Sequence, residues 1–388
     1  MKITAVTPIV LGYHKSDPPM SRSFALVRID TDAGITGWGE ASTNWGHSYP
    51  MVFASAVSEI CASALVGEDP RAIRARLADL HTRMDGYLGW EGMTSQTIGA
   101  VELALWDILG RSLDVPLWQL LGGDGHELAL YGTGTTMFDA TASWHAQYFD
   151  QAVGAGFDAV KVRLGRTQEL DLEVVRQVRE RVGESVRIGV DSYWFHNAHS
   201  ALALSQRLAE LDVFFFEEPL PQYRTAELAW LADRSPIPIA VGERVYSPRQ
   251  FADLAHTRAA GIFQPDASIC GGILASLEIA DIAAQAGIPL YPHVGGPTAI
   301  GLAANLHWAS AASVPLIEYD IDPYQPLVDE LSPALSLGAV VGGRLAPPSG
   351  PGLGVDVPDD IEERFPYQPG RTYTDVFPRH ERGTGGAS

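Results

Sequence analysis

The sequence predicts an α/β protein in which a modified (β/α) barrel of the TIM type follows an N-terminal α+β capping domain. Three acidic residues, Asp191, Glu217 and Glu243, each end a short apolar run. They are equally spaced in the sequence, because the interval from 191 to 217 equals that from 217 to 243. Each interval fits one strand and one helix, and strands recurring at that period form a barrel whose strand ends open on one face. Residues 1–124 lack this period, which indicates a separate domain.

Size and composition limit the class of protein. The 388 residues suffice for a barrel and a second domain. The two cysteines, Cys61 and Cys270, give no disulfide framework, and the start lacks the features of a signal peptide, so we expect a cytoplasmic protein. The net charge of −20 argues against nucleic acid and anionic membranes as partners, and no apolar run approaches membrane-spanning length. A small anionic substrate is still compatible with this net charge, because a bound divalent cation can dominate the electrostatic field around its site.

The capping domain is predicted at residues 1–124, with strands at 1–10, 24–30 and 35–41 and helices at 51–65, 72–80 and 95–109. Two loops rich in glycine, proline and aromatic residues are expected at 12–23 and 42–50. They could be plain surface loops, or they could close over the barrel mouth.

The barrel is predicted at residues 125–343, with eight strands in the segments LALYGTG, DAVKVRL, VRIGVD, VFFFEE, PIAVGE, GIFQPD, PLYPH and PLIEY. Eight alternating units favour a barrel over a doubly wound sheet, and no GxGxxG follows the first strand, so nucleotide binding is only weakly indicated. Residues 344–388 are rich in proline and glycine and are expected to return to the capping domain, with a disordered tail from about residue 379.

Asp191, Glu217 and Glu243 predict a metal site. Three carboxylates at one barrel mouth would repel each other unless a cation held them, and an oxygen-only ligand set suits Mg²⁺. The alternative is that each acid caps a helix or forms a loop ion pair. The equal spacing, with a buried-strand pattern before each residue, favours the metal site.

The segment DAVKVRL predicts two inward-facing cations. Because a strand alternates its faces, Lys161 and Arg163 should point into the barrel while the valines beside them face the helices. Burying two positive groups costs free energy unless an anion offsets them. That anion could be a substrate carboxylate or the metal cluster; the alternative is simple pairing with Glu217 or Glu218.

His293 and Asp266 end adjacent predicted strands and are a candidate catalytic pair. A carboxylate on one imidazole nitrogen fixes the tautomer and makes the other nitrogen a usable base. A lone histidine is more often structural, but an aspartate on the neighbouring strand end favours catalysis. Glu318, at the last strand end, could be an ion-pair partner, a metal neighbour or a proton donor. Tyr193, two residues after Asp191, could donate a hydrogen bond or only pack.

Over nearly its whole length the chain resembles the mandelate racemase subgroup of the enolase superfamily. The resemblance is carried by segments in a specific order and spacing: GAVELALWDILGR (99–111), KVR (161–163), VD (190–191), EEP (217–219), GE (242–243), QPD (264–266), PH (292–293), IE (317–318) and PGLGV (351–355). It implies an N-terminal capping domain whose loops determine the substrate, above a modified barrel. The candidates for contacting the distal end of that substrate are His14, Arg22 and His47.

The resemblance also implies a mechanism. Mg²⁺ would bind Asp191, Glu217 and Glu243, hold a substrate carboxylate and stabilise the enediolate formed when the α-proton leaves. His293, paired with Asp266, would be the base, in keeping with enolase-type sites, which combine a Lys or His base with Mg²⁺. Glu318 would donate a hydrogen bond to the substrate carboxylate, and Lys161 would add positive charge there.

Two departures from the racemase pattern narrow the reaction. Lys161-x-Arg163 stands where racemases have Lys-x-Lys, and arginine is a poor general base. Tyr193 stands where the family often has asparagine. A one-base reaction follows: Mg²⁺-dependent dehydration of an aldonate or aldarate to a 2-keto-3-deoxy acid. His293, Tyr193 or Arg163 could assist the departing hydroxyl, and we favour His293 or Tyr193. The alternatives are an epimerase or racemase, a lactone cycloisomerase, or a barrel that binds without catalysis. We expect a homo-oligomer, because closed symmetric assembly is common.

Overall fold

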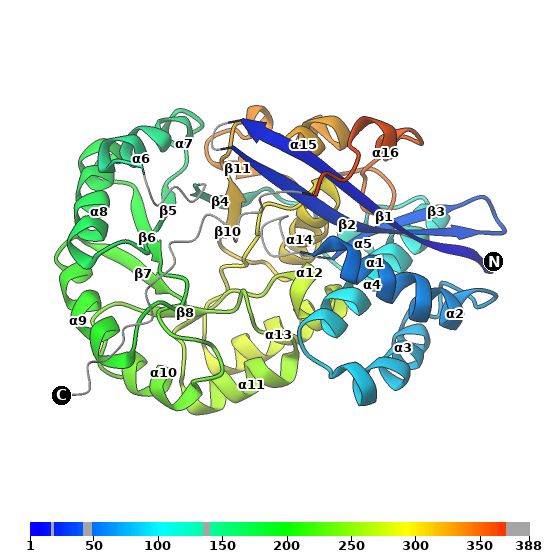
Figure 1. The fold of residues 1–388 in the computed structure, drawn as a ribbon, viewed down its shortest axis with the longest axis horizontal. Helices are drawn as coiled ribbons and strands as arrows, with labels where there is room; N and C mark the ends of the chain where they lie inside the picture. Colours follow the sequence, from blue (N-terminus) through cyan, green and yellow to red (C-terminus); the bar gives the residue numbers. More distant parts are fainter. Residues whose placement is uncertain (17–18, 42–48, 135–139, 370–388) are drawn as a thin grey trace.

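The computed structural model describes residues 1–16, 19–41, 49–134 and 140–369. It confirms the predicted fold class: a curled parallel sheet surrounded by helices forms one body, and an antiparallel sheet with its own helices lies against it (Figure 1). His47, most of the predicted loop 42–50 and the tail from about residue 379 lie outside the described residues.

The capping sheet has three antiparallel strands, β1 (Ile3–Ser16), β2 (Pro19–Thr31) and β3 (Thr36–Ala41), in that order. The predicted loop at 12–23 is instead largely strand, because β1 and β2 continue as a long hairpin in which Tyr13 pairs with Arg22. Buried Tyr13 stacks on Phe24 with ring centroids 5.7 Å apart. This cross-strand packing outweighs the turn-forming composition that suggested a loop.

The capping helices pack on this sheet. They are α1 (Pro50–Ala56), a π-helical turn (Val57–Cys61), α2 (Ala62–Leu65), α3 (Ile73–Leu88), α4 (Met93–Leu113) and α5 (Leu117–Leu120). Helix α4 lies so close to β3 that a Cβ on Gly39 would sit 1.8 Å from the carbonyl oxygen of Ala100. Only glycine permits this approach, and it fixes α4 between the sheet and the barrel.

The barrel sheet contains seven parallel strands in the order β10-β4-β5-β6-β7-β8-β9. They are β4 (Leu128–Thr133), β5 (Ala159–Arg163), β6 (Arg187–Asp191), β7 (Val213–Glu217), β8 (Ile239–Val241), β9 (Ile262–Phe263) and β10 (Ile317–Asp320). Seven of the eight predicted strand segments therefore contain a strand.

The remaining segment, PLYPH, is not a regular strand, but its backbone still closes the ring. The amide of Tyr291 donates to the Phe263 carbonyl at 2.9 Å, and the amide of Glu318 donates to the Pro292 carbonyl at 3.0 Å. Proline has no N–H to give to a ladder, so Pro289 and Pro292 prevent continuous pairing here.

The helices after each strand surround the sheet (Figure 1). They are α6 (Ala142–Tyr148), α7 (Asp150–Gly154), α8 (Gln168–Val182), α9 (Ala198–Ala209), α10 (Thr225–Ala232), α11 (Pro248–Thr257), α12 (Ala267–Cys270), α13 (Ile273–Ala286), α14 (Ala299–Ala311) and α15 (Pro326–Leu331). The last helix, α16 (Ile361–Arg364), lies instead against β1 of the capping sheet. Side-chain caps such as Thr167, Asn197 and Ser247 set where three of them begin. Buried Val160 and Val162 of β5 join the apolar core.

The chain after the barrel runs along the capping domain. The short strand β11 (Arg344–Leu345) pairs antiparallel with β4. The amide of Leu117 then donates to the Gly352 carbonyl at 2.9 Å, and the amide of Gly12 donates to the Phe365 carbonyl at 3.0 Å. Within the described part of the chain, every helix is too short or too polar to cross a bilayer.

Candidate active site

Three buried carboxylates meet at the carboxyl ends of neighbouring strands. Asp191 ends β6, Glu217 ends β7, and Glu243 follows β8. One oxygen from each lies within 4.8 Å of the others, and all three residues are buried. Parallel strands bring their ends to one face, which is why residues far apart in sequence converge here.

The donor set fits a hard divalent cation. Its carboxylate oxygens are the ligands that Mg²⁺ prefers, and their mutual repulsion in a buried site would be offset by a cation. Oε2 of Glu243 is buried and faces Nε2 of His293 at 3.2 Å. When His293 carries its proton on the nitrogen facing Asp266, Nε2 has none to give, and this oxygen stays available as a ligand. The buried acidic triad could therefore hold a metal.

Lys161 and Arg163 of β5 lie on one side of the triad, as strand alternation predicts. The Nζ of Lys161 is 2.7 Å from Oε1 of Glu217 and 2.8 Å from Oε1 of Glu318. Arg163 forms an ion pair with Asp191 and lies 3.8 Å from Glu318. The two cations therefore do more than pair with Glu217, because Glu318 lies close to both Lys161 and Arg163.

These contacts set the charge state of the site. Burial alone would lower the pKa of Lys161, but Glu217 and Glu318 outweigh it and raise that pKa, so Lys161 stays a cation. Burial, together with the charges of Asp191 and Glu318, raises the pKa of Glu217 despite Lys161. A bound cation would favour the charged form of that carboxylate.

Glu318 accepts hydrogen bonds in this structure. Its Oε2 accepts from the Val294 amide at 3.0 Å. Burial would raise its pKa, but Lys161, His293 and Arg163 outweigh burial and lower the pKa to about 2. The predicted role as a hydrogen-bond donor therefore requires a proton that this arrangement does not favour. A substrate carboxylate beside Glu318 would raise its pKa and make that role accessible.

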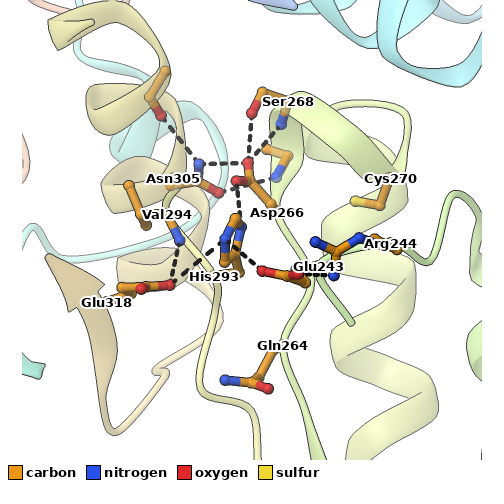
Figure 2. Close-up of polar contacts among 12 residues, drawn as sticks. Glu243, Arg244, Gln264, Asp266, Ser268, Cys270, His293, Val294, Asn305 and Glu318 are labelled. Atoms are coloured by element: carbon orange, nitrogen blue, oxygen red, sulfur yellow. Dashed lines mark hydrogen bonds and ion pairs between the residues drawn. The ribbon is translucent and has the colours of Figure 1, made fainter. Parts of the chain in front are cut away.

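His293 and Asp266 form the predicted pair (Figure 2). Nδ1 of His293 lies 3.0 Å from Oδ2 of Asp266. Nε2 of the same ring faces Glu243 at 3.2 Å and Glu318 at 3.9 Å, so it points toward the carboxylate cluster. Burial would raise the pKa of Asp266, but the hydrogen bond and charge of His293, together with the hydrogen bonds from Ser268 and Asn305, outweigh burial and lower that pKa. An ionised Asp266 holds the imidazole in the tautomer that a base at Nε2 needs.

Tyr193 is buried beside the triad, although β6 has already ended at Asp191. Its backbone is left-handed, with φ of 50°, and Trp194 follows with φ of 57°. The Tyr193 amide donates to Oδ1 of Asp191 at 3.0 Å, and the Arg163 guanidinium carbon lies 5.1 Å from the Tyr193 ring centroid. Two successive left-handed non-glycine residues are unusual, and here they turn the chain around the candidate metal ligand Asp191.

Two residues predicted to contact the substrate, Arg22 and His14, lie on the β1–β2 hairpin and have different surroundings. Arg22 is buried, and its Nη2 donates to the Gly296 carbonyl at 3.0 Å, in the loop that follows His293. It also lies 3.6 Å from Asp320. His14 is exposed, and because its neighbours Tyr13 and Lys15 are buried against the segment after β10, it faces the other side of the strand.

Sequence reasoning did not single out several residues that hold the cluster in place. Gln264 Nε2 donates to Oε2 of Glu217 at 2.5 Å and to the Tyr131 hydroxyl at 3.4 Å. Arg244 pairs with Glu243 and stacks on the Trp194 ring, 3.6 Å from its centroid. Gln264 and Tyr131 lie in predicted strand segments, so alternation could have placed them inside. No sequence signal pointed to Asn305, which contacts Asp266 from α14.

Comparisons with known proteins identify the family of both domains. The mandelate racemase / muconate lactonizing enzyme N-terminal domain matches residues 4–122, and the enolase C-terminal domain-like family matches residues 144–361. A D-galactarolactone cycloisomerase from Agrobacterium fabrum is 30% identical over 387 residues, which cover 94% of this chain and 99% of the relative. An arabinonate dehydratase from Saccharolobus solfataricus is 32% identical over 345 residues, covering 87% of this chain and 89% of the relative.

A solved structure gives the same result for the fold. A member of the enolase superfamily from Polaromonas sp. JS666 superposes with a TM-score of 0.87 at 28% identity, covering 96% of this chain and 100% of that one. The two domain matches together span both the capping domain and the barrel. This chain belongs to the mandelate racemase group of the enolase superfamily.

Proposed function

We propose that this protein dehydrates a sugar acid, an aldonate or an aldarate, to a 2-keto-3-deoxy acid with the help of Mg²⁺. One observation carries the proposal. The imidazole–carboxylate pair of His293 and Asp266 lies on one side of the carboxylate cluster, and the opposite side holds two paired cations, Lys161 and Arg163. Neither cation is a ready base, so the site supports proton removal from one face.

The side chains suggest the course of the reaction. Nε2 of His293 would take the proton from the α-carbon while Asp266 holds Nδ1, and the C–H electrons would move into an enediolate. Lys161 would stabilise the negative charge that grows on the substrate carboxylate. Asp191, Glu217 and Glu243 would hold Mg²⁺, which when bound supplies further electrostatic stabilisation at that carboxylate.

The second half of the reaction needs an acid. The bond from the β-carbon to its hydroxyl breaks as the enediolate electrons form the carbon–carbon double bond, and the oxygen leaves as water after receiving a proton. Protonated His293 can return the proton it took, so one residue would serve as base and then as acid. The enol then converts to the 2-keto-3-deoxy acid. Tyr193 could assist the departing hydroxyl, because it lies beside Asp191.

The relatives support a sugar acid as the substrate class. The arabinonate dehydratase supports loss of water, and other relatives at about this identity are named D-galactonate and D-xylonate dehydratases. The D-galactarolactone cycloisomerase favours one alternative, the opening of a lactone ring by the same proton removal. That reaction also needs one base and an anion-stabilising site, so the residues named above would serve it unchanged.

A substrate panel in D₂O with Mg²⁺ tests the proposal. Aldonates, aldarates and their lactones are incubated with the full chain, and 2-keto-3-deoxy acids, recovered acids and lactones are measured by mass spectrometry. We expect a keto acid that has lost one water and carries one deuterium at C3, because the enol takes a deuteron from the solvent there. Conversion of a lactone to a keto acid without that loss would instead support a cycloisomerase, and formation of an epimer that carries α-deuterium would support an epimerase. An inert panel would favour a barrel that binds without catalysis.

A further inference from the structure

The carboxylate of Asp266 has a second set of partners beyond His293. While Oδ2 faces the imidazole, Oδ1 accepts from the Ser268 amide at 2.9 Å, the Ser268 hydroxyl at 2.6 Å and Nδ2 of Asn305 at 2.9 Å (Figure 2). Ser268 lies two residues further along the chain, and its amide donates to Asp266 as the N-cap of α12. Asn305 comes from α14, so its bond to Asp266 depends entirely on the tertiary structure.

The side-chain amide of Asn305 can adopt only one orientation. Its Oδ1 accepts from the Ala267 amide at 3.0 Å and from the indole N–H of Trp308 at 2.9 Å. Its Nδ2 donates to Asp266 and to the Gly301 carbonyl, the latter at 3.1 Å. Exchanging oxygen and nitrogen would put two donors against donors and two acceptors against acceptors, so the network fixes the assignment.

The helix that carries Asn305 is itself held in place. Glu40 of β3 accepts from the Thr298 amide at 3.0 Å and from the Gly301 amide at 2.9 Å, at the first turn of α14. Asn305 lies in the second turn and is fully buried. A rigid line of contacts therefore runs from the capping sheet through α14 to the carboxylate that holds His293.

We propose that Asn305 is a positioning residue, whose amide sets the rotation of the Asp266 carboxylate and through it the direction of His293 Nε2. The inference rests on the proposed function, because it treats His293 as the base. A purely structural role, in which Asn305 only ties α14 to α12, predicts the same contacts. The two roles differ in what happens when the donor to Asp266 is removed while the bonds from Ala267 and Trp308 to Asn305 stay.

Asn305→Asp makes that change. The aspartate keeps the shape of asparagine and keeps Oδ1 for Ala267 and Trp308, but an oxygen replaces Nδ2, so the bonds to Oδ1 of Asp266 and to the Gly301 carbonyl are lost. We expect kcat to fall by about 10- to 100-fold, as when other groups that orient a reacting side chain are lost, with KM changed by less than about threefold. Asn305→Ala, which removes the donor without adding charge, covers the case in which the aspartate variant does not fold.

His307→Ala is the matched control on the same helix. His307 is buried and bonds the Trp118 amide and the Leu353 carbonyl, away from Asp266. We expect a lower melting temperature and an unchanged kcat. If both variants lower kcat equally, Asn305 acts only through the stability of α14 and the proposal is wrong.

An NMR measurement separates this proposal from the proposed function. In protein labelled at its 11 histidines, the Nδ1 proton of His293 is assigned by its loss in His293→Asn. We expect this resonance to shift or broaden in Asn305→Asp and Asn305→Ala and to stay in place in His307→Ala. An unmoved resonance in folded Asn305 variants would overturn the proposal. Because this readout needs no substrate, it decides the positioning role even if no sugar acid is dehydrated.

Discussion

Lys161 Nζ lies 2.8 Å from Oε1 of Glu318, and neither side chain is exposed to solvent. Such a pair would be costly to bury alone, but Glu217 also contacts the ammonium at 2.7 Å. The ammonium therefore joins a candidate metal ligand to the carboxylate of the last barrel strand. This places a fixed positive charge where a substrate carboxylate would gain charge during proton removal.

Replacing this ammonium should separate metal binding from catalysis. We predict that Lys161→Met lowers kcat by about 100- to 1,000-fold, the usual cost of losing one group that stabilises developing charge. Mg²⁺ affinity should stay equal or increase, because a nearby positive charge is removed. Titration calorimetry with Mg²⁺ and steady-state kinetics measure the two effects. Lys2→Met, at an exposed position, is the control; a variant of Lys161 that keeps full kcat would contradict its role.

The triad should be the site of metal dependence. We predict that Glu217→Gln weakens Mg²⁺ binding and lowers activity together, because a neutral amide replaces a buried carboxylate ligand. Chelation of the wild type should abolish activity, and added Mg²⁺ should restore it. Glu227→Gln, at a half-exposed position on α10, should behave like wild type. An unchanged Mg²⁺ dependence in Glu217→Gln would remove this residue from the ligand set.

The base can be tested without knowing the product. We predict that His293→Asn abolishes exchange of the substrate α-proton with D₂O, because the amide cannot accept a proton at neutral pH, while Mg²⁺ still binds the triad. Proton NMR follows the exchange. His256→Asn, at an exposed position on α11, is the matched control. Wild-type exchange rates in the His293 variant would assign the base to another residue.

The contact between β3 and α14 should make the folded state less stable as the pH rises. Burial raises the pKa of Glu40 from 4.5 to about 7, although Thr298 and Gly301 donate to it. The folded state therefore keeps a proton that the unfolded state releases, and the contribution of Glu40 to stability is full below about pH 4.5 and lost as the pH rises through about 7.

This prediction is measured by urea unfolding at pH 5 and pH 7.5. Each pKa unit corresponds to about 1.4 kcal/mol, so we expect Glu40 to remove about 1–3 kcal/mol of unfolding free energy over that interval. Glu102, with a pKa raised to about 7 by burial, acts in the same direction. Glu40→Gln should flatten the dependence, and Glu59→Gln, at an exposed position, should not. If the unfolding free energy of Glu40→Gln changed between the two pH values as much as that of the wild type, Glu40 would not be the source of the pH dependence.

Much of the fold was predictable because the barrel repeats one local pattern. An apolar run that ends in a polar residue marks each strand end, and the parallel sheet brings those ends together whatever the intervening helices are. Asp191, Glu217, His293 and Glu318 were found in this way. The seventh strand segment was predicted but not formed as a regular strand, because apolar patterning cannot show how two prolines interrupt a ladder.

The long hairpin could not be predicted from local composition. Glycine, proline and aromatic residues between residues 12 and 23 suggested a loop, but the pairing of Tyr13 with Arg22 and the stacking of Tyr13 on Phe24 extend both strands. Arg22 then bonds the backbone at Gly296 rather than standing as an isolated cation. This last contact links residues 274 positions apart.

The sequence by itself determined the family, the fold class and the residues at the strand ends, because strand periodicity and short motifs are local properties. Only the tertiary structure decided which cation pairs with which carboxylate, that Glu318 joins Lys161, and that Asn305 holds Asp266. The physical reason is that hydrogen bonds and ion pairs depend on separations of about 3 Å, which the packing of helices and strands fixes and sequence spacing does not.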